Sequence, residues 1–154
     1  WMEVELFSKM ADIKGVSFYS LQEGCQDDIE LTDGHNKMLI HGFGSAFDKT
    51  QGSFMDTAAV MKNLDLVITV DTSVAHLAGA IGVKTWLLLC SNFEYRWFSK
   101  NEYCPWYRNV KMFIQPKFND WKNVINKVKE KLIRAIEEKR DATAHLFFKK
   151  LRQG

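Results

Sequence analysis

The chain has 154 residues, a length that suits one domain with a single hydrophobic core. Hydrophobic residues make up 46% and charged residues 26%, as in ordinary globular domains, and the net charge of +2 is too small to indicate a nucleic-acid partner. The sequence has no signal-peptide pattern, no apolar run of bilayer length, and no CxxC pairing that would indicate a disulfide framework or a zinc site. We therefore expect a cytoplasmic protein.

Patterns typical of helices and of strands alternate along the chain. The first half is predicted to contain, in order, a helix at 3–11, strands at 16–21 and 38–42, and a helix at 54–64. The second half is predicted to contain a strand at 65–70, a helix at 73–81, strands at 83–90 and 110–115, and a long amphipathic helix from Trp121.

Two of the predicted strands, 65–70 and 83–90, are nearly unbroken apolar runs. Such strands are typically buried on both faces of a parallel sheet that is covered by helices. The alternation of strands and helices then predicts an α/β domain with a Rossmann-like, doubly wound parallel sheet and right-handed crossovers. We expect Asp71 to lie at the carboxyl end of a central strand of that sheet.

The last helix has the clearest pattern. Asn119 or Asp120 can cap it, and apolar residues recur 3, 4, 7, 11 and 15 positions after Trp121. We assign residues 1–139 to the domain and 140–154 to a basic, partly apolar tail. We expect the tail to pack on a partner domain or to be partly disordered, with at most a peripheral contact to a membrane.

The most informative motif is the turn Asp71-Thr72-Ser73 between the strand at 65–70 and the helix at 73–81. In open α/β sheets, ligands bind beyond the carboxyl ends of the strands, where helices begin. Free amides and the positive end of the helix dipole at that point suit a phosphate or a pyrophosphate. Local physics alone leaves an equal alternative, in which the three residues are only a helix cap and His76 is a hydrogen-bonded core histidine.

A series of segments, kept in order along the chain, resembles a known family. These segments are Phe18-Tyr19-Ser20-Leu21-Gln22, Phe54-Met55-Asp56-Thr57-Ala58-Ala59, residues 65–80, Trp86-Leu87-Leu88-Leu89, Arg96-Trp97, Pro105-Trp106-Tyr107, Gln115 and Asp120-Trp121. They resemble the C-terminal domain of family 9 glycosyltransferases, the group of the bacterial lipopolysaccharide heptosyltransferases. The resemblance is closer still to the glycosyltransferase-like domain that follows tetratricopeptide repeats in many bacterial proteins.

This resemblance implies the C-terminal half of a GT-B glycosyltransferase, in which two Rossmann-like domains face each other across a cleft. The half in question binds the nucleotide-diphospho-sugar donor as a co-substrate, and the family uses no catalytic metal or other cofactor. The family's first strand of this domain and its whole N-terminal domain would precede Trp1. The N-terminal domain would supply the general base and the acceptor site, so no catalytic residue is assigned here and we expect the isolated chain to be inactive.

The resemblance also implies a diphosphate site on the turn. Thr72, Ser73 and Val74 would hold the donor diphosphate through amides and hydroxyls. Asp71 would orient the turn or contact the donor, and His76 would support the loop.

Further site residues follow from the same resemblance and from composition. Gln22 and Glu23 would contact the ribose or base, and Met55 and Asp56 would lie near the nucleoside pocket; these four residues form the implied nucleoside site. Arg96 and Trp97 are candidates for a phosphate or sugar contact, although aromatic residues in a long connection more often anchor it to the core.

A second class of function stays open at this point. The second interpretation, after the glycosyltransferase, is a non-catalytic relative that binds a nucleotide or a protein partner, because fold does not determine function. A response-regulator module is disfavoured, because no acidic cluster follows the first predicted strand.

Overall fold

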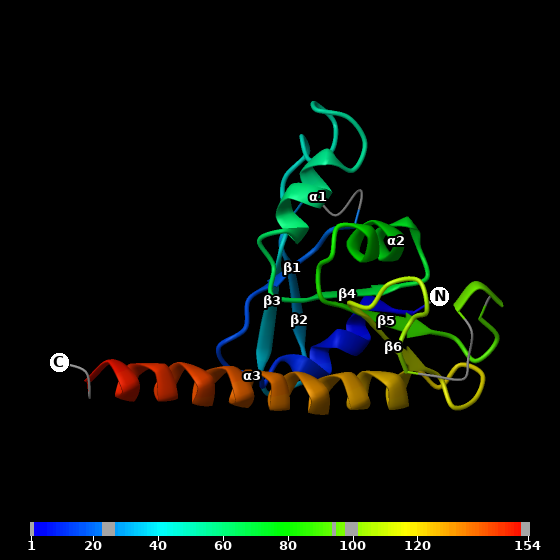
Figure 1. The fold of residues 1–154 in the computed structure, drawn as a ribbon. Helices are drawn as coiled ribbons and strands as arrows, with labels where there is room; N and C mark the ends of the chain where they lie inside the picture. Colours follow the sequence, from blue (N-terminus) through cyan, green and yellow to red (C-terminus); the bar gives the residue numbers. More distant parts are fainter. Residues whose placement is uncertain (1, 23–26, 94, 98–101, 152–154) are drawn as a thin grey trace.

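The computed structural model describes residues 2–22, 27–93, 95–97 and 102–151, and only the backbone of residues 141–151 (Figure 1). The helices are η1 (Val4–Met10), α1 (Met55–Met61), α2 (Ser73–Ala80), η2 (Tyr95–Trp97) and α3 (Trp121–Leu151). The strands are β1 (Phe18–Tyr19), β2 (Ile29–Thr32), β3 (Lys37–His41), β4 (Val67–Val70), β5 (Thr85–Leu89) and β6 (Val110–Ile114). Each predicted strand and helix is present, mostly with trimmed ends, and η1 is a 3₁₀-helix instead of an α-helix.

The strands form two three-stranded sheets, not one. The second sheet has the order β4-β5-β6 and is parallel throughout, with Thr85 paired to both Val67 and Val110. The first sheet has the order β1-β3-β2, in which β1 pairs with β3 in parallel and β2 pairs with β3 antiparallel. The prediction of an α/β fold with a parallel sheet is therefore confirmed for the second sheet.

The prediction of a single, wholly parallel sheet is wrong, because the strands divide between two sheets and because β2, a strand that we did not predict, runs antiparallel to β3. Only residues 33–36 separate β2 from β3, and so short a connection can only join antiparallel neighbours. The Asp33 carboxylate fixes this turn by accepting hydrogen bonds from the amides of His35 (2.9 Å) and Asn36 (2.7 Å). The expected central position of the strand before Asp71 is also corrected, since β4 lies at the edge of its sheet.

One hydrophobic cluster joins the two sheets to α3, which runs along the base of the fold (Figure 1). The first sheet contributes Leu31, Met38 and Ile40, the second contributes Trp86, Leu88 and Phe113, and η1 contributes Met10. The α3 residues in this cluster are Val124, Ile125, Val128 and Leu132. Their spacing is the one predicted from the amphipathic pattern, so the packing face of α3 is confirmed.

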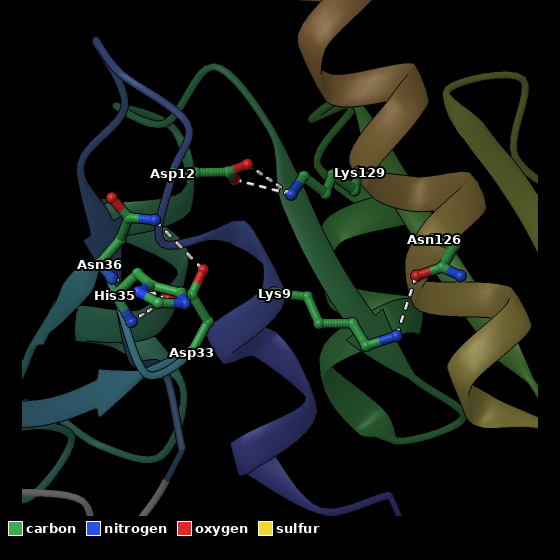
Figure 2. A network of polar contacts seen from close by, with 7 residues as sticks. All are labelled: Lys9, Asp12, Asp33, His35, Asn36, Asn126 and Lys129. Carbon is green, nitrogen blue, oxygen red and sulfur yellow. Dashed lines mark hydrogen bonds and ion pairs between the residues drawn. The ribbon is translucent and has the colours of Figure 1, made fainter.

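Polar contacts hold η1 and the segment after it against α3 (Figure 2). The Lys9 ammonium donates to the Asn126 side-chain oxygen at 3.0 Å, and the Lys129 ammonium lies 2.7 Å from the Asp12 carboxylate. Such exposed pairs each contribute roughly 0–1 kcal/mol, so they orient the helix more than they stabilise the fold.

Beyond this packing, α3 continues without a break through the expected boundary at 139/140 and extends past the rest of the fold (Figure 1). Lys139, just before that boundary, pairs with Asp65 at 2.6 Å. None of the helices in the described part of the chain has the length and apolar character needed to cross a membrane.

Candidate functional site

The turn between β4 and α2 is exposed at Asp71, Thr72 and Ser73. Thr72 occupies the cap position of α2 with extended backbone angles (φ −143°, ψ 173°), and its carbonyl accepts the amide of Ala75 at 3.0 Å. Its hydroxyl lies 3.5 Å from the carbonyl of Val70 and makes no capping bond to a helix amide. The cap residue therefore leaves the first amides of α2 without a side-chain acceptor, which disfavours the alternative of a purely structural side-chain cap.

This arrangement has the features of an anion site. The first-turn amides of a helix carry about half a positive charge, and they are stabilised by any acceptor that reaches them. A phosphate oxygen beside Ser73 or Val74 would meet such an amide, and the exposed Thr72 and Ser73 hydroxyls are available as further donors. The turn also follows a parallel strand, as such sites commonly do.

His76 lies on the first turn of α2 and contacts two aromatic residues from the long connection between β5 and β6. Its ring stacks on Trp97 with the centroids 4.8 Å apart and an interplanar angle of 23°. Its Nδ1 atom lies 3.3 Å from the Tyr107 hydroxyl, whose ring meets it edge-on at 6.0 Å. His76 thus ties the connection to α2, an arrangement that fits both the alternative of a hydrogen-bonded core histidine and the supporting role that the resemblance implies.

Gly79 makes the contact with Tyr107 possible. A Cβ atom at this position would lie 2.5 Å from Cγ of the Tyr107 ring, well inside the van der Waals distance. Ala75 and Ala78 of α2 are likewise buried. We refer to His76, Gly79, Trp97 and Tyr107 as the aromatic clasp.

The structure separates Arg96 and Trp97, the two candidates for a phosphate or sugar contact in the connection between β5 and β6. The Trp97 side chain is fully buried against the core, so it packs in the protein and is not presented to a phosphate or sugar. Arg96 is exposed, and its carbonyl accepts the Trp106 indole N–H at 2.8 Å. A phosphate contact of the Arg96 side chain stays a prediction.

The residues of the implied nucleoside site lie in different surroundings. Gln22 and Met55 are exposed, and Glu23 lies outside the described residues. Asp56 has a structural bond, because its carboxylate accepts the amide of Asp48 at 2.8 Å. The end of β1, α1 and α2 meet in one hydrophobic cluster, which contains Met61, Val67, Ala78 and Val83 with Leu21, Leu64, Val74, Leu77 and Ile81 packed on it.

Asp48, in the loop that precedes α1, caps this helix, a role that sequence reasoning missed. One of its carboxylate oxygens accepts the amides of Asp56 (2.8 Å) and Thr57 (3.1 Å), and the other accepts the Thr57 hydroxyl. Burial alone would raise the pKa of Asp48, but these hydrogen bonds together hold the pKa below its usual value. The adjacent cap residue, Phe54, makes no side-chain cap bond, and no local pattern points to an acceptor several residues upstream.

Across the described residues, no three His, Cys, Asp or Glu side chains are grouped closely enough to hold a metal ion. The turn and the aromatic clasp present backbone amides, hydroxyls, a carboxylate, an imidazole and aromatic rings.

Comparison with known proteins gives one relative and no family assignment. The chain is 26% identical over 124 residues to the protein FlbA of Caulobacter vibrioides, a match that covers 80% of this chain. The matched region corresponds to 20% of FlbA, so this chain spans about a fifth of that protein's length. No family model matches the chain, and no solved structure shows a significant match to it.

Proposed function

We propose that this chain is the donor-binding domain of a GT-B glycosyltransferase, which would transfer a sugar from a nucleotide-diphospho-sugar to a glycan, lipid or protein acceptor in the cytoplasm. The observation that carries the proposal is the exposed β4–α2 turn, whose helix amides have no capping side chain from Thr72. The sequence resemblance described above supports the same assignment, because its most specific residues form this turn and the aromatic clasp.

In this proposal the chain binds the donor and stabilises the leaving group. The amides of Ser73 and Val74 and the Thr72 hydroxyl hold the diphosphate, and the helix dipole stabilises the charge that develops as the sugar leaves. His76 keeps the turn in place through the aromatic clasp. The general base and the acceptor site belong to the N-terminal domain that the family carries, with or without tetratricopeptide repeats before it. The chain alone should therefore have no transfer activity.

Binding of a nucleoside diphosphate tests the proposal directly. ADP, GDP, UDP and dTDP are titrated into the wild-type chain, with the matching nucleosides in parallel, and heat of binding is recorded. We expect one diphosphate to bind with a dissociation constant of about 10 µM to 1 mM, and its nucleoside to bind more weakly.

The Ser73→Asp variant then separates a ligand site from a cap. An aspartate at the helix N-terminus satisfies the dipole, so the melting temperature should be kept, while the negative charge should repel the diphosphate. Ser17→Asp is the matched control, because Ser17 is also exposed but precedes a strand. Equal binding by wild type and a well-folded Ser73→Asp variant would leave the turn as a structural feature only. The non-catalytic alternative would then be favoured.

A further inference from the structure

A cavity of about 390 Å³ lies between the first sheet and α1. Tyr19 and Phe43 line it on the sheet side, and Ala59, Val60, Asn63 and Leu64 line it on the helix side. Its size is at the small end of the range of ligand pockets, and its lining is mostly apolar, with Asn63 and Tyr19 as the lining residues that have polar side-chain groups.

The sheet side of the cavity is built from stacked rings. Tyr19 and Phe43 are nearly parallel, with centroids 5.8 Å apart and an interplanar angle of 22°, and Phe43 stacks in turn on Phe47 at 4.8 Å and 17°. Tyr19 also packs beside His41 at 5.2 Å. Despite these contacts, 44% of the Tyr19 surface stays exposed. A flat aromatic ligand would extend this series of stacked rings and cover the exposed surface.

The opposite wall of the cavity is formed by residues of α1 and of the segment that follows it. Val60 and Leu64 present aliphatic groups, and Asn63 gives its amide N–H₂ to the carbonyl of Ala59 at 2.8 Å. That bond fixes the orientation of the Asn63 amide at the rim. The Asn63 side-chain oxygen can then accept a hydrogen bond from an amino group at the edge of a ring. Apolar walls with one oriented polar group are suited to a nucleobase, which has two flat faces and a polar edge.

We propose that this cavity binds the base of the nucleotide donor, between the Tyr19 and Phe43 rings and the Val60–Leu64 side of α1. The identity of the ring as the donor's base rests on the proposed function. Leu64, which lines the cavity, and Val74, beside the diphosphate turn, pack on the same hydrophobic cluster. This assignment differs from the nucleoside site implied by the resemblance, because the ring contacts come from Tyr19 and Phe43.

Two variants test the cavity. Tyr19→Ser removes a stacking ring, and Ala59→Phe fills the cavity from an exposed helix position that should tolerate the larger side chain. Each should weaken binding of ADP or UDP roughly tenfold, the size of one lost stacking contact, and should leave binding of inorganic pyrophosphate unchanged. Tyr95→Ser is the matched control, because Tyr95 is 84% exposed and does not line the cavity.

The outcomes separate this inference from the proposed function. If Ser73→Asp weakens ADP binding while both cavity variants bind ADP like the wild type, the cavity assignment fails and the diphosphate site stands. If wild type binds no nucleoside diphosphate, adenosine alone is added at millimolar concentration, and the methyl NMR signals of Val60 and Leu64 are followed. Ring-current shifts of these signals, lost in Ala59→Phe, support the cavity; unshifted signals overturn it.

Discussion

The two sheets of this chain are stabilised in different ways. In the second sheet β5 is buried along its whole length, between the α3 side and the side that contacts α2. In the first sheet β3 alternates between exposed and buried residues, and carboxylates fix the adjoining backbone. Asp33 holds the β2–β3 turn, Asp48 caps α1, and Asp28 accepts the amide of Gly42 at 2.9 Å.

This contrast has a physical consequence for stability. Apolar burial does not depend on protonation, whereas a carboxylate that accepts several hydrogen bonds in the folded state loses that advantage when it is protonated. The first sheet and α1 should therefore weaken in acid before the second sheet does. The three predictions that follow test this difference, from the largest expected effect to the smallest.

The largest effect is expected from Leu88→Ala. Leu88 is fully buried in the cluster that joins both sheets and α3, and such truncations cost about 2–5 kcal/mol through lost transfer energy and a residual cavity. Urea unfolding at neutral pH measures the free energy of unfolding. Leu39→Ala is the control, since Leu39 is 44% exposed on the first sheet and should cost far less. Similar losses for the two variants would contradict the assigned difference in burial.

An intermediate effect is expected from Asp48→Ala, which leaves the Asp56 and Thr57 amides and the Thr57 hydroxyl without their acceptor. The loss should be about 1–3 kcal/mol at pH 7. Because the folded-state pKa of Asp48 is lowered, its stabilisation is fully present above the unfolded-state pKa and declines as the pH falls through that value and further. The difference from wild type should therefore shrink in acid. Unfolding curves at pH 7, 5 and 3 measure it, and a constant difference would rule out this role of the carboxylate.

The smallest effect is expected at the exposed β2–β3 turn. Hydrogen bonds from the backbone amides of Asn36 and His35 lower the pKa of Asp33 to about 2. The Asp33 carboxylate should therefore stabilise the turn above about pH 4, and this contribution should be lost as the pH falls from 4 toward 2. NMR titration of the Asp33 carboxyl carbon measures the pKa directly. In the Asp33→Asn variant, amide exchange in β2 and β3 should be faster than in wild type at pH 6, and a midpoint near 4 in the titration would contradict the hydrogen-bonded turn.

The same contrast explains which features could be predicted from sequence. The second sheet and α3 were predictable from local sequence patterns. An unbroken apolar run indicates a strand that is buried on both faces, and apolar residues at a helical period indicate the buried face of a helix. The strand β2 has a clean alternation in Ile29-Glu30-Leu31-Thr32, so a period-2 search would have found it. The Asp48 cap spans eight or nine residues across the loop before α1, and the pairing of Tyr107 with Gly79 joins two distant segments, so a single sequence contains no local pattern for either contact.

The candidate turn and the aromatic clasp likewise combine features that follow from local sequence with contacts that depend on tertiary packing. The sequence predicts its position between β4 and α2, and the structure confirms that its three residues are exposed there. The buried position of Trp97 agrees with the expectation that aromatic residues in a long connection more often anchor it to the core. Its packing on His76 is set by how the connection folds back over α2.

The aromatic clasp places a fluorescent residue, Trp97, close to the β4–α2 turn. Trp97 is fully buried and stacked on His76, one turn from Ser73, so the emission of its indole depends on the position of the imidazole beside it. A ligand that displaces the first turn of α2 would change the distance between the His76 and Trp97 rings. The quenching of the Trp97 fluorescence would then change with it. A Trp97→Phe variant removes this signal and leaves Trp1, Trp86, Trp106 and Trp121 as the background. Fluorescence of the unlabelled protein can therefore follow events at the turn in real time.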